Sequence, residues 1–274
     1  MGELNMTNDE LDRFEASFLN IIGPKNNESH VNKILKQKGN LYFGFDMDAT
    51  IGNVHQFHKL IQKYPQGNPV YDKIISFIAN EERTIANEER KNLSVFNPLI
   101  VGTLQKIAEK NKIEKRIYCM IYSNHGDLKM VQFASDVLEK IIGEKLFCAH
   151  VHYSHSIRKD DDKILNKTWD TFQNIFTELC GVPEPTPENS VFFDDLEHTN
   201  LKQTLGDNYI QVTPYNVRCL YFPERIKDLP NVGGGRKLNT QKNRKNRKNF
   251  IKNIKRTLKK NFKKLYPIEN ATST

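Results

Sequence analysis

Two aspartates separated by a single residue, Asp46 and Asp48, occupy the short segment FDMDAT of residues 45–50. Carboxylates this close either bind a divalent cation together or hold one proton between them, and both states are useful in catalysis. A second acidic pair, Asp194 and Asp195, would bring the local acid count to four. That charge density favours a hard cation with oxygen ligands, such as Mg²⁺. An isolated pair of aspartates is also common in solvated acidic turns.

A hydroxyl and an amide, those of Ser123 and Asn124, stand next to each other in a separate part of the chain. Both groups form hydrogen bonds to phosphoryl oxygens. A lysine beside them would offset the charge of a phosphoryl group held among carboxylates. This combination of residues fits phosphoryl transfer better than hydride or acyl transfer.

These polar groups follow apolar segments of strand length. Strands are predicted at residues 41–45, 116–122, 146–151 and 190–193, and helices at residues 98–112, 127–142 and 167–179. Strands that alternate with helices predict an α/β fold with a mostly parallel sheet and helices on both faces. Three of the strands end on Asp46, Ser123 and Asp194, and parallel sheets place their ligand crevice at the carboxyl ends of the strands. The sequence therefore predicts that these residues share one site.

Residues 54–95 are polar, have helical periodicity and contain the phrase ANEER twice, at residues 79–83 and 86–90. Two copies are too few for a repeat architecture. We interpret the segment as a solvated helix with mixed charges, and the alternative is a small helical insertion near the site entrance. Pro98 is expected in the first turn of the next helix, where proline is tolerated.

The order of these motifs resembles that of the haloacid dehalogenase-like (HAD) phosphatases. Residues 45–51 match their hydrophobic-D-x-D-x-T signature, residues 122–124 look like their second motif, and residues 191–195 with Asn200 are similar to their acidic ending. The resemblance covers about residues 40–215. Within the superfamily, it points to the branch that holds the RNA polymerase II C-terminal-domain phosphatase-like (NLI-interacting-factor-like) proteins and the small magnesium-dependent phosphatases.

The resemblance implies a Rossmann-like HAD fold with a small helical insertion after the first motif, and a Mg²⁺-dependent phosphomonoester hydrolase. Asp46 would attack phosphorus to give an aspartyl-phosphate, and Asp48 would act as general acid and then as general base. Thr50 would orient Asp48. The Mg²⁺ ion would be held by Asp46, the backbone carbonyl of Asp48 and Asp194, with Asp195 behind these ligands.

The resemblance also implies roles in substrate binding. Ser123 and the neighbouring backbone N–H, together with Asn124, would hold the phosphoryl oxygens. Lys167 is favoured as the lysine of the site, because it opens the predicted helix that leads to the acidic ending, and Lys163 is the next candidate. We interpret His125 as a cap of the following helix, with a contact to substrate as the alternative.

The chain has a formal net charge of +8, but this charge is unevenly distributed. Fourteen of the 41 lysines and arginines lie in residues 236–264, and only one of the 33 acids lies beyond residue 235, so residues 1–235 have 27 bases, 32 acids and a net charge of −5. Apolar residues recur at helical spacing among the lysines of residues 250–265, which predicts a basic amphipathic helix. Its candidate partners are nucleic acid or an acidic protein, with a solubilising or targeting tail and a membrane surface as alternatives.

These patterns predict three parts: a helical extension at residues 1–36, a phosphatase domain at residues 37–232, and a flexible basic tail with an amphipathic helix at residues 233–274. No apolar run has the length of a membrane span, and the acidic start of the chain does not resemble a secretory signal. The four cysteines are predicted to be free thiols in a reducing compartment. We therefore expect an intracellular protein of the nucleus or cytoplasm. The asparagine- and lysine-rich composition suggests an AT-rich genome, and similar tailed chains are encoded by large DNA viruses, so the cell could be an infected host.

Three functions remain open at this stage. The first is a serine/threonine protein phosphatase that acts on a phosphoprotein and is directed to it by the tail. The second is a phosphatase for nucleic-acid ends or nucleotides. The third is a catalytically inactive scaffold with a nucleic-acid-binding tail.

Overall fold

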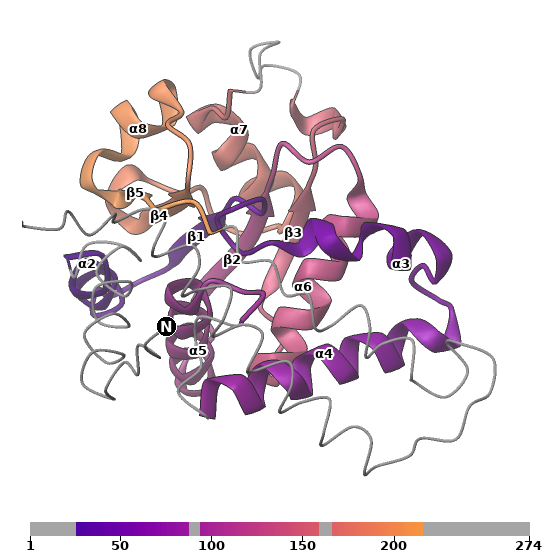
Figure 1. Ribbon diagram of the computed structural model, residues 1–274. Coiled ribbons are helices and arrows are strands. Elements are labelled where there is room, and N and C mark those ends of the chain that lie inside the picture. The colour runs from indigo at the N-terminus through magenta and orange to yellow at the C-terminus, as the bar shows by residue number, and fades with distance from the viewer. Residues whose placement is uncertain (1–25, 88–93, 159–165, 216–274) are drawn as a thin grey trace, which may run out of the picture. The chain divides into compact units, whose positions relative to one another are not determined.

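A computed structural model of the chain describes residues 26–87, 94–158 and 166–215. Five parallel strands form a single sheet in the order β3-β2-β1-β4-β5 (Figure 1). They are β1 (Leu41–Phe45), β2 (Ile117–Tyr122), β3 (Phe147–Val151), β4 (Ser190–Asp194) and β5 (Tyr209–Gln211). The prediction of a parallel α/β sheet is confirmed, and the first four strands lie where they were predicted. Strand β5 was not predicted, because three residues carry too little periodicity to identify a strand.

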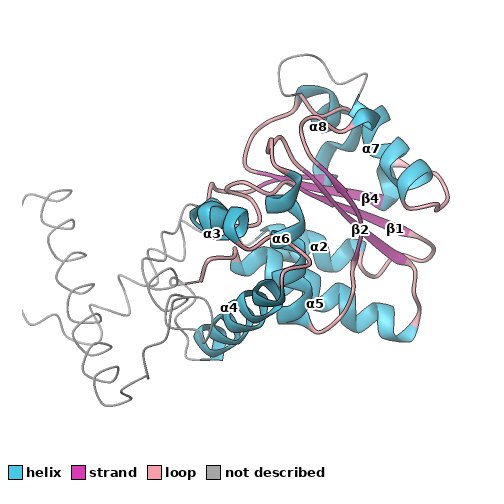
Figure 2. Ribbon diagram, turned by 90° about the vertical axis from the view of Figure 1, so that its right-hand side faces the viewer, coloured by secondary structure: helices cyan, strands magenta, loops and turns pink. Residues whose placement is uncertain are grey.

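Helices cover both faces of the sheet (Figure 2). On one face lie α7 (Trp169–Asn174), its continuation as a π-helical turn η4 (Ile175–Leu179), and α8 (Thr199–Leu205). On the other face lie α5 (Pro98–Ile113) and α6 (Leu128–Ile142), with α2 (Asn26–Ile34) beside α5 and with α3 (His58–Lys63) and α4 (Pro69–Asn87) against α6. Short 3₁₀ turns are η1 (Val54–Phe57), η3 (Ser156–Arg158), η5 (Pro187–Asn189) and η6 (Gly206–Asn208).

The central strand β1 is buried along its whole length, which explains its unbroken apolar sequence. Its one small residue, Gly44, faces the aromatic core under α7. A Cβ atom at this position would lie 2.5 Å from the ring of Phe192 and 2.9 Å from that of Phe172. Glycine is therefore needed so that β1 and β4 can pair beneath these rings.

The strand order places the switch point of the sheet between β1 and β4. The chain runs outward from β1 through β2 to β3, then returns to the other side of β1 to form β4 and β5. Open parallel sheets bind ligands at the carboxyl ends of the strands on either side of such a point. Asp46 follows β1 directly, and Asp194 is the last residue of β4.

Helix α4 is not the fully solvated helix that the polar composition suggested. Its residues Tyr71, Ile74, Ile78 and Ala79 are buried, and the helix packs against α6. The prediction missed this buried face because the apolar positions 71, 74, 75, 78 and 79 lie among many charged residues. Helices α3 and α4 follow β1 in the chain, as the alternative of a small helical insertion requires, and a place near the site entrance stays a prediction.

The end of this insertion pairs with the loop that follows β1. Asn53 donates its backbone N–H to Val95 O at 3.1 Å, and Asn97 donates its own to Ile51 O at 2.8 Å. A Cβ atom on Gly52 would lie 2.3 Å from Val95 O, so the two segments can approach this closely only at a glycine. Backbone hydrogen bonds to residues 95–97 thus fix the loop after β1.

A buried carboxyl group, Glu82 on α4, fixes residues 94–96. It accepts the backbone N–H of Val95 at 2.9 Å and forms a very short hydrogen bond with the hydroxyl of Ser94. That hydroxyl also lies 2.7 Å from the carbonyl oxygen of Phe96 and has only one proton for the two acceptors. A protonated Glu82 would supply the missing proton. Burial raises the pKa of Glu82 to about 7, despite the hydrogen bonds from Ser94 and Val95, which lower it.

We expect Glu82→Gln to remove a pH dependence of stability. A raised carboxyl pKa stabilises the fold below the pKa of the unfolded chain, and this contribution is lost as pH rises towards 7. Glutamine keeps an acceptor for Val95 and a donor for Ser94 at every pH. Between pH 5 and pH 8, the free energy of unfolding of the variant, measured in urea, should therefore rise relative to that of the wild type by roughly 3 kcal/mol. A Glu81→Gln control should show no such gain, and equal pH profiles for Glu82→Gln and the wild type would contradict the protonated network.

Two of the four cysteines differ from the prediction of free thiols. Cys148 on β3 and Cys180 after η4 form a disulfide with their Cα atoms 5.3 Å apart. Because η4 packs against the edge strand β3, it brings together residues that are 32 positions apart, which sequence spacing alone does not reveal. Cys119 is free and buried, in agreement with the prediction.

Several predictions fall outside the described residues: the N-terminal helix before residue 26, Cys219, and the basic tail of residues 233–274. None of the described helices has the combination of length and apolar character that is needed to cross a membrane.

Candidate active site

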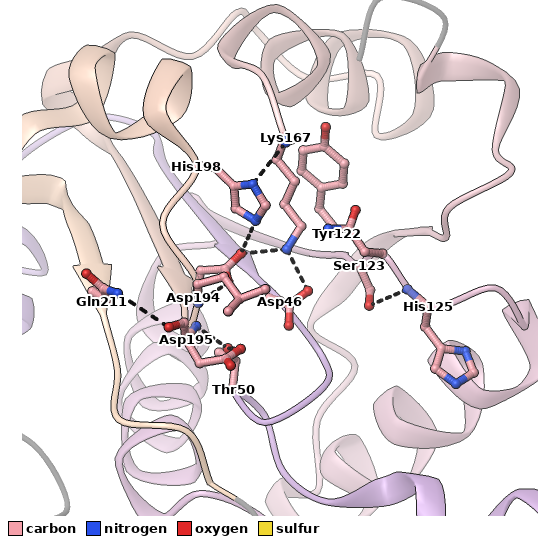
Figure 3. Close-up of polar contacts among 12 residues, drawn as sticks. Asp46, Thr50, Tyr122, Ser123, His125, Lys167, Asp194, Asp195, His198 and Gln211 are labelled. Carbon is pink, nitrogen blue, oxygen red and sulfur yellow. Dashed lines mark hydrogen bonds and ion pairs between the residues drawn. The ribbon is translucent and has the colours of Figure 1, made fainter. Parts of the chain in front are cut away.

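The predicted residues of the three strand ends meet at one edge of the sheet (Figure 3). Asp46 continues β1, and its backbone N–H donates to Phe193 O on β4 at 2.8 Å. Asp194 ends β4 beside it, and Ser123 follows β2 on the other side of β1. All three residues are buried, so their polar groups depend on one another rather than on bulk water.

Lys167 joins the two aspartates. Its Nζ atom lies 2.6 Å from Asp46 Oδ1 and 2.5 Å from Asp194 Oδ2, and the side chain is only 1% exposed. The rings of Tyr122 and Phe192 flank the ammonium group, with centroids 5.8 and 5.3 Å away. Lys167 lies two residues before α7 rather than in its first turn, because Thr168 is the N-cap. Lys163, the other candidate lysine, lies outside the described residues.

The protonation of this triad follows from burial and neighbouring charge. Burial raises the pKa of Asp46 to about 7; Lys167 pulls it down, and the charge of Asp194 pushes it up. Burial would also raise the pKa of Asp194, but Lys167 and His198 outweigh it and hold that pKa below its usual value. The two carboxylates outweigh burial at Lys167 and raise the pKa of its ammonium group. The lysine therefore stays charged, and Asp194 is its ionised partner.

Three carboxylates could hold a metal ion here. Asp46, Asp194 and Asp195 each place an oxygen within 4.8 Å of the others. With all three carboxylates ionised, Lys167 balances one of the three negative charges. The two negative charges that remain match the charge of a divalent cation. Oxygen donors of this kind suit Mg²⁺. The side chain of Asp48 is not part of this carboxylate group; the resemblance implied only its backbone carbonyl as a ligand.

Thr50 differs from the role expected for it. Its hydroxyl donates to Asp195 Oδ1 at 3.0 Å and accepts the backbone N–H of Asp195 at 2.8 Å. A hydroxyl has a single proton, so Thr50 orients Asp195 rather than Asp48. The residue thereby ties the loop after β1 to the end of β4.

The loop from Met47 to Gly52 turns sharply and contains Asp48, which forms a backbone bridge with Gly52. Ala49 has a φ of 58°, and its carbonyl oxygen accepts the backbone N–H of Tyr215 at 2.6 Å. A non-glycine residue with this φ is uncommon and is held here by the surrounding bonds. Burial raises the pKa of Asp48, while His125 and His55 lower it. The carboxyl group therefore retains a proton at higher pH than an exposed aspartate does.

Ser123 and Asn124 form a rigid loop after β2. Ser123 Oγ accepts the backbone N–H of His125 at 3.1 Å, which leaves the hydroxyl proton for another acceptor. Arg158 donates to Ser123 O at 2.9 Å and to Asn124 Oδ1 at 2.8 Å. The amide oxygen of Asn124 is thus engaged within the protein.

Two residues of the site were not identified from the sequence. Arg158 is buried under the loop of Ser123, and its guanidinium carbon lies 5.1 Å from the ring centroid of Tyr122. His198 is also buried; its Nδ1 accepts the backbone N–H of Lys167 at 3.3 Å, and its Nε2 lies 3.2 Å from Asp194 Oδ2. The position of His198 four residues after Asp194 was a signal that it could reach back to this carboxylate. Arg158 had no such signal.

The prediction that His125 caps α6 was incorrect. Asp127 is the N-cap and accepts the backbone N–H of Lys129 at 3.0 Å. His125 instead accepts the backbone N–H of Asp127 on its Nδ1 atom at 3.0 Å. Aspartate is one of the preferred N-cap residues, so composition alone favoured it.

Comparisons with known proteins do not assign the chain to a family: no family model, curated protein or solved structure matches it.

Proposed function

We propose that the chain is a Mg²⁺-dependent phosphomonoester hydrolase of the HAD type that forms an aspartyl-phosphate on Asp46. The observation that carries this proposal is the buried triad of Asp46, Lys167 and Asp194 at the switch point of the sheet. The lysine orients one carboxylate without neutralising the acidic site, which suits the binding of a phosphoryl group together with a cation.

The roles of the residues follow from their contacts. Lys167 holds Asp46 Oδ1, which leaves Oδ2 to attack phosphorus. As the Asp46–phosphorus bond forms, the bond to the leaving oxygen breaks and Asp48 protonates that oxygen. Water then attacks phosphorus while Asp48 takes up the water's proton, which releases phosphate and restores both aspartates. Ser123 has a hydroxyl proton for a phosphoryl oxygen throughout.

Asp46, Asp194 and Asp195 would hold the Mg²⁺ ion, with the backbone carbonyl of Asp48 as the resemblance implies. When bound, the ion would neutralise charge on the phosphoryl group. Thr50 orients Asp195 through a hydrogen bond, and Lys167 donates to Asp194 Oδ2, with His198 Nε2 3.2 Å from the same oxygen.

The substrate that we propose, as the resemblance implies, is an intracellular protein that is phosphorylated on serine or threonine. The basic segment of residues 236–264 would bring the enzyme to nucleic acid or to an acidic partner. The same segment favours a second candidate substrate, phosphorylated nucleic-acid ends or nucleotides, which would contact it directly.

We expect the full chain to hydrolyse p-nitrophenyl phosphate in Mg²⁺, and EDTA to abolish turnover until Mg²⁺ is restored in excess. Deletion of residues 236–274 separates the substrates: loss of activity on 3′-phosphorylated DNA alone would favour nucleic-acid ends, and an unchanged rate on a phosphopeptide would favour the protein phosphatase. Absence of hydrolysis in Mg²⁺ at every pH from 5 to 8 would reject the enzyme and favour the inactive scaffold.

A further inference from the structure

Five of the eight histidines of the chain lie in three segments that follow the carboxyl ends of β1, β2 and β3. We call them the histidine rim: His55, His58, His125, His152 and His155. His55 and His58 follow the loop after β1, His125 follows Ser123, and the last two lie between β3 and η3. The three segments are far apart in sequence, so their proximity is a product of the fold.

Ring contacts connect the first two segments. His55 stacks nearly parallel to His58, with centroids 5.5 Å apart, and its ring lies 6.1 Å from that of His125. His58 Nε2 is 3.5 Å from a carboxylate oxygen of Asp127, the one acid among these contacts.

The third segment is tied to the second by its backbone. Tyr153 donates its N–H to His125 O at 3.0 Å, and the rings of His152 and His155 lie 6.0 Å apart, edge to face. Arg158 follows in the same turn and contacts the loop of Ser123. The second and third segments of the rim therefore lie beside the strand end that carries the proposed phosphoryl-binding hydroxyl.

The hydrogen bonds of the rim favour an anionic ligand over a metal ion. The Nδ1 atom of His155 accepts the backbone N–H of Ile157, so its neutral ring carries the hydrogen on Nε2, and the Nδ1 atom of His125 is occupied by the backbone of Asp127. A metal ion requires unprotonated nitrogens that converge. Within the described residues, only the carboxylates of Asp46, Asp194 and Asp195 bring three ligand atoms within 4.8 Å of one another.

The rim also lies on the side of the proposed general acid. Asp48 forms a bridge with Gly52, and η1 with His55 begins two residues later. His55 in turn lies beside His125, with their ring centroids 6.1 Å apart. Because Asp48 would protonate the leaving oxygen, groups beside it contact the leaving group rather than the transferred phosphoryl group.

We infer that the histidine rim binds a second phosphate on the leaving group of the substrate. The inference rests on the proposed function and narrows its substrate class to phosphomonoesters with a further phosphate near the one that is removed. A hydrogen bond to a charged group is stronger than one between neutral groups, so each donor should contribute about tenfold or more to selectivity.

The test compares kcat/KM for doubly and singly phosphorylated substrates in two pairs: a serine peptide with two phosphates or one, and adenosine 3′,5′-bisphosphate or adenosine 5′-phosphate. The pair with the larger ratio identifies the source of the ligand. His55→Phe keeps a ring over His58 but removes the donors, and His155→Asn keeps an acceptor for Ile157 but removes the Nε2 hydrogen. Each variant should lower the ratio about tenfold or more. His30→Phe is the matched control, because His30 is outside the rim and its Nε2 lies 2.9 Å from Asn208 Oδ1; this variant should keep the wild-type ratio.

Equal kcat/KM within both wild-type pairs, or a preference that both variants retain, would overturn the inference. Stoichiometric binding of Zn²⁺ alone that both variants abolish, without any preference for a second phosphate, would make the rim a metal site and also overturn it. If the wild type hydrolyses none of the substrates, the proposed function fails separately. Calorimetry with pyrophosphate and phosphate then tests the rim directly, because only pyrophosphate binding should weaken in both variants.

Discussion

Asp46→Asn is expected to abolish phosphomonoester hydrolysis while the protein stays folded. Asparagine has the same shape and keeps an acceptor for Lys167, but its amide cannot form an acyl phosphate. Loss of such a residue costs on the order of 10⁴-fold or more in turnover. Steady-state rates on p-nitrophenyl phosphate measure the loss, and acid quenching with a radiolabelled substrate should show a covalent phosphoenzyme for the wild type only.

The stability of this variant distinguishes a chemical loss from unfolding. Burial raises the pKa of Asp46 to about 7, so the wild type loses stability as pH rises from about 4 towards 7. Asparagine does not ionise and avoids that loss. At pH 8 and without Mg²⁺, the variant should therefore resist urea at least as well as the wild type. Turnover within tenfold of the wild type would place the nucleophile elsewhere.

The positions of the main site residues followed from the sequence because each is attached to a strand end. The apolar composition of residues 41–45 is enough to predict a buried strand. The parallel arrangement then brings Asp46 and Ser123 to one edge of the sheet, independently of the conformation of the loops. Asp194 reached the site for the same reason. These predictions depended only on local patterns and on the geometry that all parallel sheets share.

Contacts made by loops were not predictable in this way. Arg158 donates to Ser123 O from a 3₁₀ turn, and Thr50, after β1, forms a hydrogen bond with Asp195, after β4. Cys148 meets Cys180 because η4 packs against β3. Each contact depends on the path of a connection whose length and turns are specific to this chain. A side chain's type limits the bonds it can make, but only the fold selects the partner.

Lys167→Met should destabilise the protein strongly, because it removes the cation from between two buried carboxylates. Methionine fills a similar volume against Tyr122 and Phe192 but leaves Asp46 and Asp194 facing each other. Breaking a buried pair in this way costs about 3–5 kcal/mol in the free energy of unfolding. Without the lysine, the carboxyl pKa values rise further, so the deficit should be largest at pH 8 and shrink towards pH 5.

A matched variant, Lys202→Met, separates this effect from the general loss of a lysine. Lys202 Nζ lies 2.7 Å from Glu197 Oε2, as close as the buried pair, but both side chains are about half exposed. Such a surface pair contributes at most about 1 kcal/mol. Mg²⁺ should stabilise the wild type and both variants, since an ion that binds only the folded chain stabilises it, and it should also reduce the deficit of Lys167→Met, because a cation then lies between the unpaired carboxylates. If urea unfolding gave the two variants equal stability at pH 8, the lysine would not hold the two aspartates in solution, and the proposed orientation of Asp46 for attack would lose its basis.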